Sequence, residues 1–92
     1  MREKDIPTIQ DIITAQKLMD KGVVRKTPLL KSKTFSSMAR TNIFLNMESF
    51  QKTGSFKVRG AYSKMNSLTV DQCKSGVVAA SAGNHAQGVA YA

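Results

Sequence analysis

Two segments of this chain each join an expected β-strand to a following helix, and this repeated unit restricts the fold more than any other feature. Residues 43–48 place Ile, Leu and Met on one face and Phe, Asn and Glu on the other, which predicts a strand; after a loop at 49–54, a helix is expected to about Asn66. Residues 77–80 are wholly apolar, as in a buried parallel strand, and another helix is expected from about Asn84. Strands that alternate with helices predict an α/β protein with a mostly parallel sheet.

Polar side chains mark where the helices are expected to begin, because an oxygen just before the first turn accepts a free backbone N–H. Pro28 lacks a backbone donor, so the segment 23–30 is expected to be extended and to form at most a short edge strand. The expected helices run from Thr8 to Asp20 with Gly22 as the stop, from Ser32 or Thr34 to Arg40, from Thr53 or Ser55 to Asn66, and from Thr69 to Lys74.

Lys57 is expected in the first turn of the helix that follows the Thr-Gly-Ser turn at residues 53–55. The positive end of the helix dipole disfavours an ammonium group there, and burial beneath Phe56 and Val58 would act in the same direction. A neutral amine can add to an aldehyde, so this lysine is a candidate nucleophile. Position alone is weak support, because most lysines near helix starts are solvated surface groups.

The second strand-to-helix loop, Ser-Ala-Gly-Asn-His at residues 81–85, has the composition of an anion site. A glycine-containing loop that opens a helix directs several backbone N–H groups at one point, and Ser81 and Asn84 add side-chain donors. An α-carboxylate would fit there, although an ordinary helix cap without a ligand explains the pattern equally well. Ligands of open α/β sheets bind beyond the carboxyl ends of the strands, so one cleft can receive both Lys57 and this loop.

Together the two motifs resemble the fold-type II pyridoxal-phosphate enzymes, and most closely their threonine dehydratase (threonine ammonia-lyase) and serine racemase branch. Ser-Phe-Lys-Val-Arg-Gly-Ala at 55–61 is similar to the family's cofactor-lysine motif, and Ser-Ala-Gly-Asn-His-Ala-Gln-Gly at 81–88 to its substrate-carboxylate loop. Lys-Thr-Pro-Leu at 26–29 agrees, and the resemblance extends from about Ile9 onward. It implies a tryptophan synthase β-subunit-like fold, a three-layer and mostly parallel sheet with helices on both faces.

The resemblance implies pyridoxal 5′-phosphate as the cofactor, bound covalently by Lys57, with Phe56 against its ring and Asn84 hydrogen-bonded to its phenolic oxygen. Phe56 as a core aromatic fits the sequence equally well. The residues that the resemblance assigns to the substrate carboxylate are Ser81, Gly83, Asn84 and His85. The freed lysine would remove the α-proton, and loss of the β-hydroxyl would convert threonine to 2-oxobutanoate and ammonia, or serine to pyruvate.

Ala82 distinguishes members of the family. Serine racemases carry a serine at the matching position that protonates the far face of the substrate, and an alanine methyl cannot transfer a proton. Elimination is therefore favoured, with a serine racemase-like or other type II enzyme as the alternative. Relatives also bind nucleotide effectors, and the residues that this likeness assigns to such a site are Thr53, Gly54 and Gln87.

The helix expected from Asn84 has no stop signal before Ala92, and enzymes of the family are several times longer. Residues 1–92 are therefore expected to be the N-terminal, incomplete portion of a pyridoxal-phosphate-dependent catalytic domain, with the family's glycine-rich phosphate loop beyond Ala92. The longer parent is expected to be a homo-oligomer that acts on threonine and serine, in isoleucine biosynthesis or threonine catabolism.

The chain carries 14 Lys and Arg against 6 Asp and Glu, a net charge of +8, which raises the question of nucleic-acid binding. These cations are scattered and lack interleaved aromatic side chains for stacking bases, so no nucleic-acid partner is expected. The single Cys73 forms no internal disulfide and has no metal-ligand spacing. With no signal-like or membrane-spanning apolar run, a cytoplasmic setting is expected and no membrane partner.

Two readings compete with the enzyme. A small basic module that binds nucleic acid or another anion would show salt-dependent binding. A chain that does not fold would give a random-coil far-UV circular dichroism spectrum.

Overall fold

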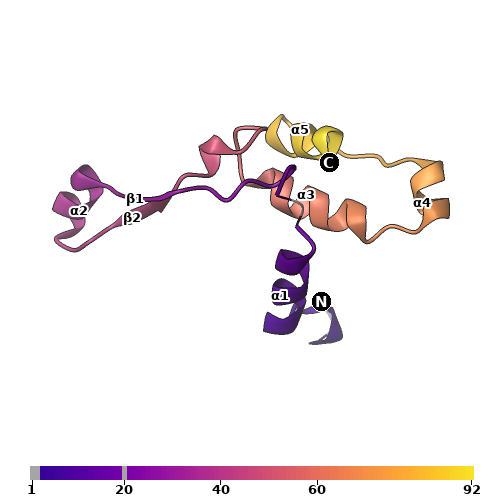
Figure 1. Ribbon diagram of the computed structural model, residues 1–92, viewed down its shortest axis with the longest axis horizontal. Coiled ribbons are helices and arrows are strands. Elements are labelled where there is room, and N and C mark those ends of the chain that lie inside the picture. The colour runs from indigo at the N-terminus through magenta and orange to yellow at the C-terminus, as the bar shows by residue number, and fades with distance from the viewer. Residues whose placement is uncertain (1–2, 20) are drawn as a thin grey trace.

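The computed structural model describes residues 3–19 and 21–92, which form short helices and one small sheet (Figure 1). The strands are β1 (Leu29–Lys31) and β2 (Phe44–Asn46). The helices are η1 (Glu3–Asp5), α1 (Ile9–Lys17), α2 (Lys33–Ala39), η2 (Glu48–Phe50), α3 (Lys57–Asn66), α4 (Val70–Ser75) and α5 (Asn84–Tyr91). The radius of gyration is 16.3 Å, against about 12 Å for a compact domain of this length. The chain is therefore elongated.

An arm made of β1, α2 and β2 projects from the helical part of the molecule (Figure 1). β1 and β2 pair antiparallel, with Leu30 opposite Leu45. Ser32 caps α2 by accepting a hydrogen bond from the backbone N–H of Phe35. Phe35 and Met38 of this helix are exposed and line an open groove along the arm.

Helices α3 and α5 lie side by side and run in the same direction (Figure 1). Gly88 makes this packing possible: a Cβ added there would lie 3.2 Å from the carbonyl carbon and oxygen of Lys57 and 3.3 Å from the Val58 nitrogen. Val58 and Ala61 are buried, and the first turn of α3 is held against the middle of α5. A residue larger than glycine would force the two helices apart.

Most helix caps agree with the sequence. Thr8 and Thr69 each form a capping box, with Asp11 and Gln72 respectively. Helix α1 ends at Lys17 rather than at Asp20, which lies outside the described residues. The expected cap of α3 was wrong, because the N-cap is Phe56, which has no side-chain capping bond.

The strand expected at residues 77–80 does not form, because this segment has no regular secondary structure; the described residues form one sheet, which is antiparallel. Val78 is fully exposed and Val77 is about half exposed. A strand needs a neighbour to accept and donate its backbone hydrogen bonds, and no segment of the described chain lies along 77–80 as a second strand. This segment instead runs back beside α3 and leads into α5 (Figure 1).

Gly88→Ala is expected to lower the free energy of unfolding by about 1–3 kcal/mol, because its methyl group must displace the backbone of Lys57. Gly60→Ala is the matched control, since it also lies inside a helix but a Cβ there meets nothing within 4 Å. Alanine's better helix propensity should make that control more stable by about 0.5–1 kcal/mol. Urea unfolding followed by far-UV circular dichroism measures both, and equal effects would contradict the described packing of α5 on α3.

Candidate functional site

Lys57 is the first residue of α3 and so lies in the first turn of that helix, as predicted. Its backbone N–H donates to the Ser55 hydroxyl oxygen at 3.4 Å, which attaches the turn to the helix start. The Lys57 side chain is exposed, and its Nζ lies 5.2 Å from the centre of the Phe56 ring. The expected burial beneath Phe56 is not found, because that ring is 60% exposed and covers the amine on one side alone.

The loop before α5 folds back on itself at Ser81. The Ser81 hydroxyl oxygen accepts a hydrogen bond of 3.0 Å from the Gly83 N–H. Gly83 is the N-cap of α5, and its carbonyl oxygen accepts from the Gln87 N–H at 3.1 Å. The next backbone N–H groups, those of Asn84 and His85, belong to the first turn, where a helix has no internal acceptor for them. The arrangement leaves donors open to an anion at this helix start.

The two motifs meet through Gly88. Lys57 touches α5 with its backbone at a point about one turn beyond Asn84. The helices run in the same direction, so both helix starts lie at the same end of the pair (Figure 1). Two positive dipole ends and one exposed amine therefore gather there, with side chains of Ser81 and Asn84 also exposed. This end of the pair suits a ligand that carries negative charge.

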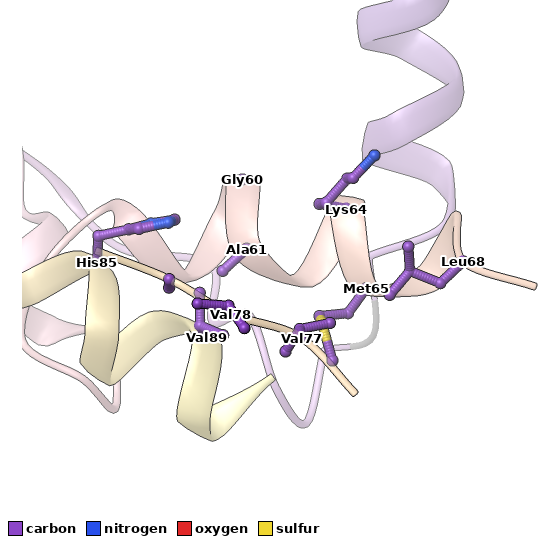
Figure 2. Close-up of a pocket in the computed structure, with 10 residues that line it drawn as sticks. Gly60, Ala61, Lys64, Met65, Leu68, Val77, Val78, His85 and Val89 are labelled. Atoms are coloured by element: carbon purple, nitrogen blue, oxygen red, sulfur yellow. The ribbon is translucent and has the colours of Figure 1, made fainter. Parts of the chain in front are cut away.

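His85 is the second residue of α5. It lines an apolar groove between α3, α5 and the segment 77–79, together with Gly60, Ala61 and Val89 (Figure 2). Figure 2 shows His85 near the start of α5 and Leu68 near the far end of α3. The imidazole is thus placed among apolar neighbours, whereas Ser81 and Asn84 do not line that groove.

A polar network holds the loop that leads to Lys57. The Glu48 carboxylate accepts hydrogen bonds from Arg59 Nε at 2.8 Å, from Gln51 Nε2 at 2.9 Å and from the Thr27 hydroxyl at 3.2 Å. Gln51 is buried, and it also donates to the Arg25 carbonyl oxygen at 2.8 Å and accepts from the Arg25 N–H at 2.9 Å. The network joins the extended segment 25–27, η2 and α3.

The charge of Glu48 is favoured by these partners. Burial of the carboxylate raises its pKa, but hydrogen bonds from Arg59 and Gln51 and the positive charge of Arg59 outweigh burial and hold the pKa below its ordinary value. Sequence reasoning assigned no role to Gln51 or Glu48. Their position in the sequence could have indicated such a role, because both residues lie between the β2 strand and the lysine motif.

The residues assigned to a nucleotide effector are Thr53 and Gly54 in the loop before α3 and Gln87 in α5. The Thr53 hydroxyl is buried and has no hydrogen-bond partner in the described part of the chain. Gly54 has a φ of 76°, a left-handed conformation that favours glycine, and its N–H donates to the Gln51 carbonyl oxygen at 2.9 Å. Gln87 is exposed on α5. The effector site stays a prediction.

Within residues 3–19 and 21–92, no three His, Cys, Asp or Glu side chains come close enough to bind a metal ion. None of the helices in these ranges is both long and apolar enough to cross a membrane.

Comparison with known proteins decides the family. Residues 21–92 match the model of the pyridoxal-phosphate dependent enzymes. The chain belongs to this family. It is 54% identical over 85 residues to the L-threonine ammonia-lyase of Thermotoga maritima, an alignment that covers 92% of this chain and 21% of that protein. It is 50% identical over 86 residues to the catabolic L-threonine dehydratase TdcB of Escherichia coli, covering 92% and 26% respectively.

A solved structure of maize serine racemase agrees with the fold, with a TM-score of 0.79 and 39% sequence identity. The match covers 89% of this chain and 26% of that one. The chain therefore has the α/β fold of part of a fold-type II pyridoxal-phosphate enzyme. It spans between a fifth and about a quarter of the length of the relatives named here.

Glu48→Gln keeps the size of the side chain but removes its charge. A folded-state pKa below 4.5 means that Glu48 stabilises the fold fully above pH 4.5, and that this contribution is lost as the pH falls through the folded pKa. At pH 7 the substitution should lower the free energy of unfolding by about 1 kcal/mol, a value discounted for the exposure of Arg59.

Urea unfolding at pH 7 and at pH 3 measures this effect, and the difference from wild type should shrink at pH 3. Glu3→Gln at an exposed position serves as the control and should change neither value. A Glu48→Gln effect of the same size at both pH values would contradict the role of the charged carboxylate.

Proposed function

We propose that residues 1–92 are the N-terminal portion of the catalytic domain of a pyridoxal-phosphate-dependent threonine ammonia-lyase, which converts threonine to 2-oxobutanoate and ammonia and serine to pyruvate. The observation that carries the proposal is the contact of Gly88 with Lys57 and Val58. This contact brings the exposed amine and the Ser81–Asn84 loop to the same end of two parallel helices. The 50–54% identity to the threonine-deaminating relatives supports the choice of substrate class.

The side chains at this end fit pyridoxal phosphate. Lys57 offers an exposed amine that pairs with no carboxylate in the described part of the chain. Phe56 offers a largely exposed ring beside that amine. Asn84 offers an exposed side-chain amide that donates no hydrogen bond to the described residues and can meet a phenolic oxygen. When bound, the cofactor supplies an electron sink for the charge left on the substrate α-carbon.

The remaining chemistry belongs to this chain's own residues. The Lys57 amine can accept the α-proton of the substrate, because it is a base held at the helix start. Donors at the start of α5, with the Ser81 hydroxyl and Asn84 amide, orient the substrate through its carboxylate. His85 is proposed at this carboxylate from family likeness alone, since it lines the apolar groove.

A serine racemase is the second candidate, because maize serine racemase has a closely similar structure over most of this chain. Ala82 argues for elimination instead. Racemisation needs an acid that returns a proton to the opposite face of the α-carbon, and the methyl group of Ala82 has no proton to give.

A chimera tests the proposed function. Residues 9–92 of this chain would replace the matching segment of the Thermotoga maritima L-threonine ammonia-lyase, which is 54% identical. The chimera should release ammonia and a 2-oxo acid from threonine. Lys57→Ala in the chimera should lower kcat by at least about a thousandfold, because it removes both the cofactor anchor and the base.

Lys52→Ala in the same chimera is the control, since Lys52 is also an exposed loop lysine. It should keep most of the activity. A folded chimera that deaminates no threonine, or one whose activity survives Lys57→Ala, would contradict the proposal.

The 92-residue chain alone is expected to bind the cofactor poorly and to turn over no substrate, because the exposed Lys57 is covered on one side alone by Phe56. Adding pyridoxal phosphate, reducing with borohydride and mapping labelled lysines by mass spectrometry measures this. Labelling should be weak and spread over several lysines. Tight and selective labelling of Lys57 would show the expectation to be wrong.

A further inference from the structure

A second concave surface shares no lining residue with the apolar groove of Figure 2 and none with the Lys57 site. It has a volume of about 630 Å³, within the range of small-molecule sites. We call it the basic groove. Its lining residues are Gln16, Met19, Lys21, Val24, Arg25, Lys26, Thr27, Leu29, Asn46 and Arg59.

Four of these side chains are cations, and none is an acid. Lys21 and Lys26 form no ion pair with the described residues. Arg25 donates from Nη1 to the Phe50 carbonyl oxygen at 3.3 Å, so its guanidinium is oriented but its charge is not neutralised. Arg59 is paired with Glu48, the one carboxylate that the described network brings to this wall.

The positive charge in the groove does little to stabilise the fold, but it favours binding of an anion. Cations that line one concavity repel one another, and low-dielectric walls concentrate their field on whatever lies between them. The lining also includes the apolar side chains of Met19, Val24 and Leu29, of which Val24 is buried. Neutral amides of Gln16 and Asn46 complete the lining with further hydrogen-bond donors.

We propose that the basic groove binds a small metabolite that carries a multivalent phosphate group. Arg59 is already paired with Glu48, so a monocarboxylate could neutralise one of the three remaining cations, whereas a diphosphate can meet several at once. Arginine forks and lysine ammonium groups both suit phosphate oxygens. The apolar side chains of the groove can take the uncharged part of such a molecule. The proposal does not depend on the proposed lyase function, because Lys57, Ser81 and Asn84 lie outside the groove.

Inorganic pyrophosphate is the probe. Isothermal titration calorimetry on the 92-residue chain at about 0.15 M salt, where exposed charges are largely screened, should give saturable binding at one site. Sodium acetate at equal ionic strength should give none. In a ¹⁵N spectrum, the backbone amides of residues 21–27 and the Asn46 side-chain amide should shift with pyrophosphate, while those of residues 81–85 should not.

The double variant Lys21→Ala/Lys26→Ala should bind pyrophosphate at least about tenfold more weakly, because two charge-assisted contacts are lost. Lys33→Ala/Lys74→Ala removes the same two charges from exposed positions outside the groove and should change the affinity less than about twofold. Both variants should retain the wild-type far-UV circular dichroism spectrum.

Three results would overturn the proposal: no saturable binding to the wild-type chain, an equal loss in both double variants, or amide shifts spread over the whole chain. The last two would assign the binding to net charge alone. If the Lys21→Ala/Lys26→Ala variant failed to fold, the location of the amide shifts in the wild-type chain would still decide the question.

Discussion

The Glu48 carboxylate is the interaction on which this structure most depends. It joins three parts of the chain that share little apolar contact: Thr27 in the extended segment, Gln51 in the loop and Arg59 in α3. The buried apolar core of the described residues is small, made of Val24, Val58 and Ala61. With so little apolar burial, satisfied polar groups decide where the loop before Lys57 lies. Arg59 donates from both Nε and Nη2 to one oxygen of Glu48, Oε1, and so holds the first turn of α3 against η2.

Local features of this fold were predictable, because the sequence signals that produce them act over three or four residues. Thr8, Ser32 and Thr69 cap helices as their spacing predicts, and Lys57 and Asn84 begin helices. What the sequence did not reveal depends on partners far along the chain. Gln51 reads as an ordinary polar loop residue, yet it is buried because the backbone of Arg25 supplies its hydrogen bonds.

The segment 77–80 is a second case in which a distant partner, rather than the local sequence, decides the structure. Its valines and alanines have the composition of a buried strand, but the segment has no regular secondary structure and is exposed. Pairing is a property of two segments, and the described chain offers no second one there. Composition alone therefore predicted a strand, and the prediction was wrong for these residues. The position of Gly88 was equally hidden, because a glycine inside a helical pattern does not reveal which backbone it touches.

The chemistry proposed for Lys57 also depends on one local feature, the helix start, and on one feature that is not local, enclosure of the amine. The helix start is local, and it places a positive dipole end and free N–H groups near the amine. Neighbouring residues in the sequence do not remove the Lys57 amine from water. Phe56 alone cannot enclose it, and the side chain remains exposed. A lysine that must act as a neutral base needs that enclosure. The described residues thus bring the proposed nucleophile and the proposed carboxylate-binding loop to one end of α3 and α5, where Phe56 alone leaves the Lys57 amine exposed.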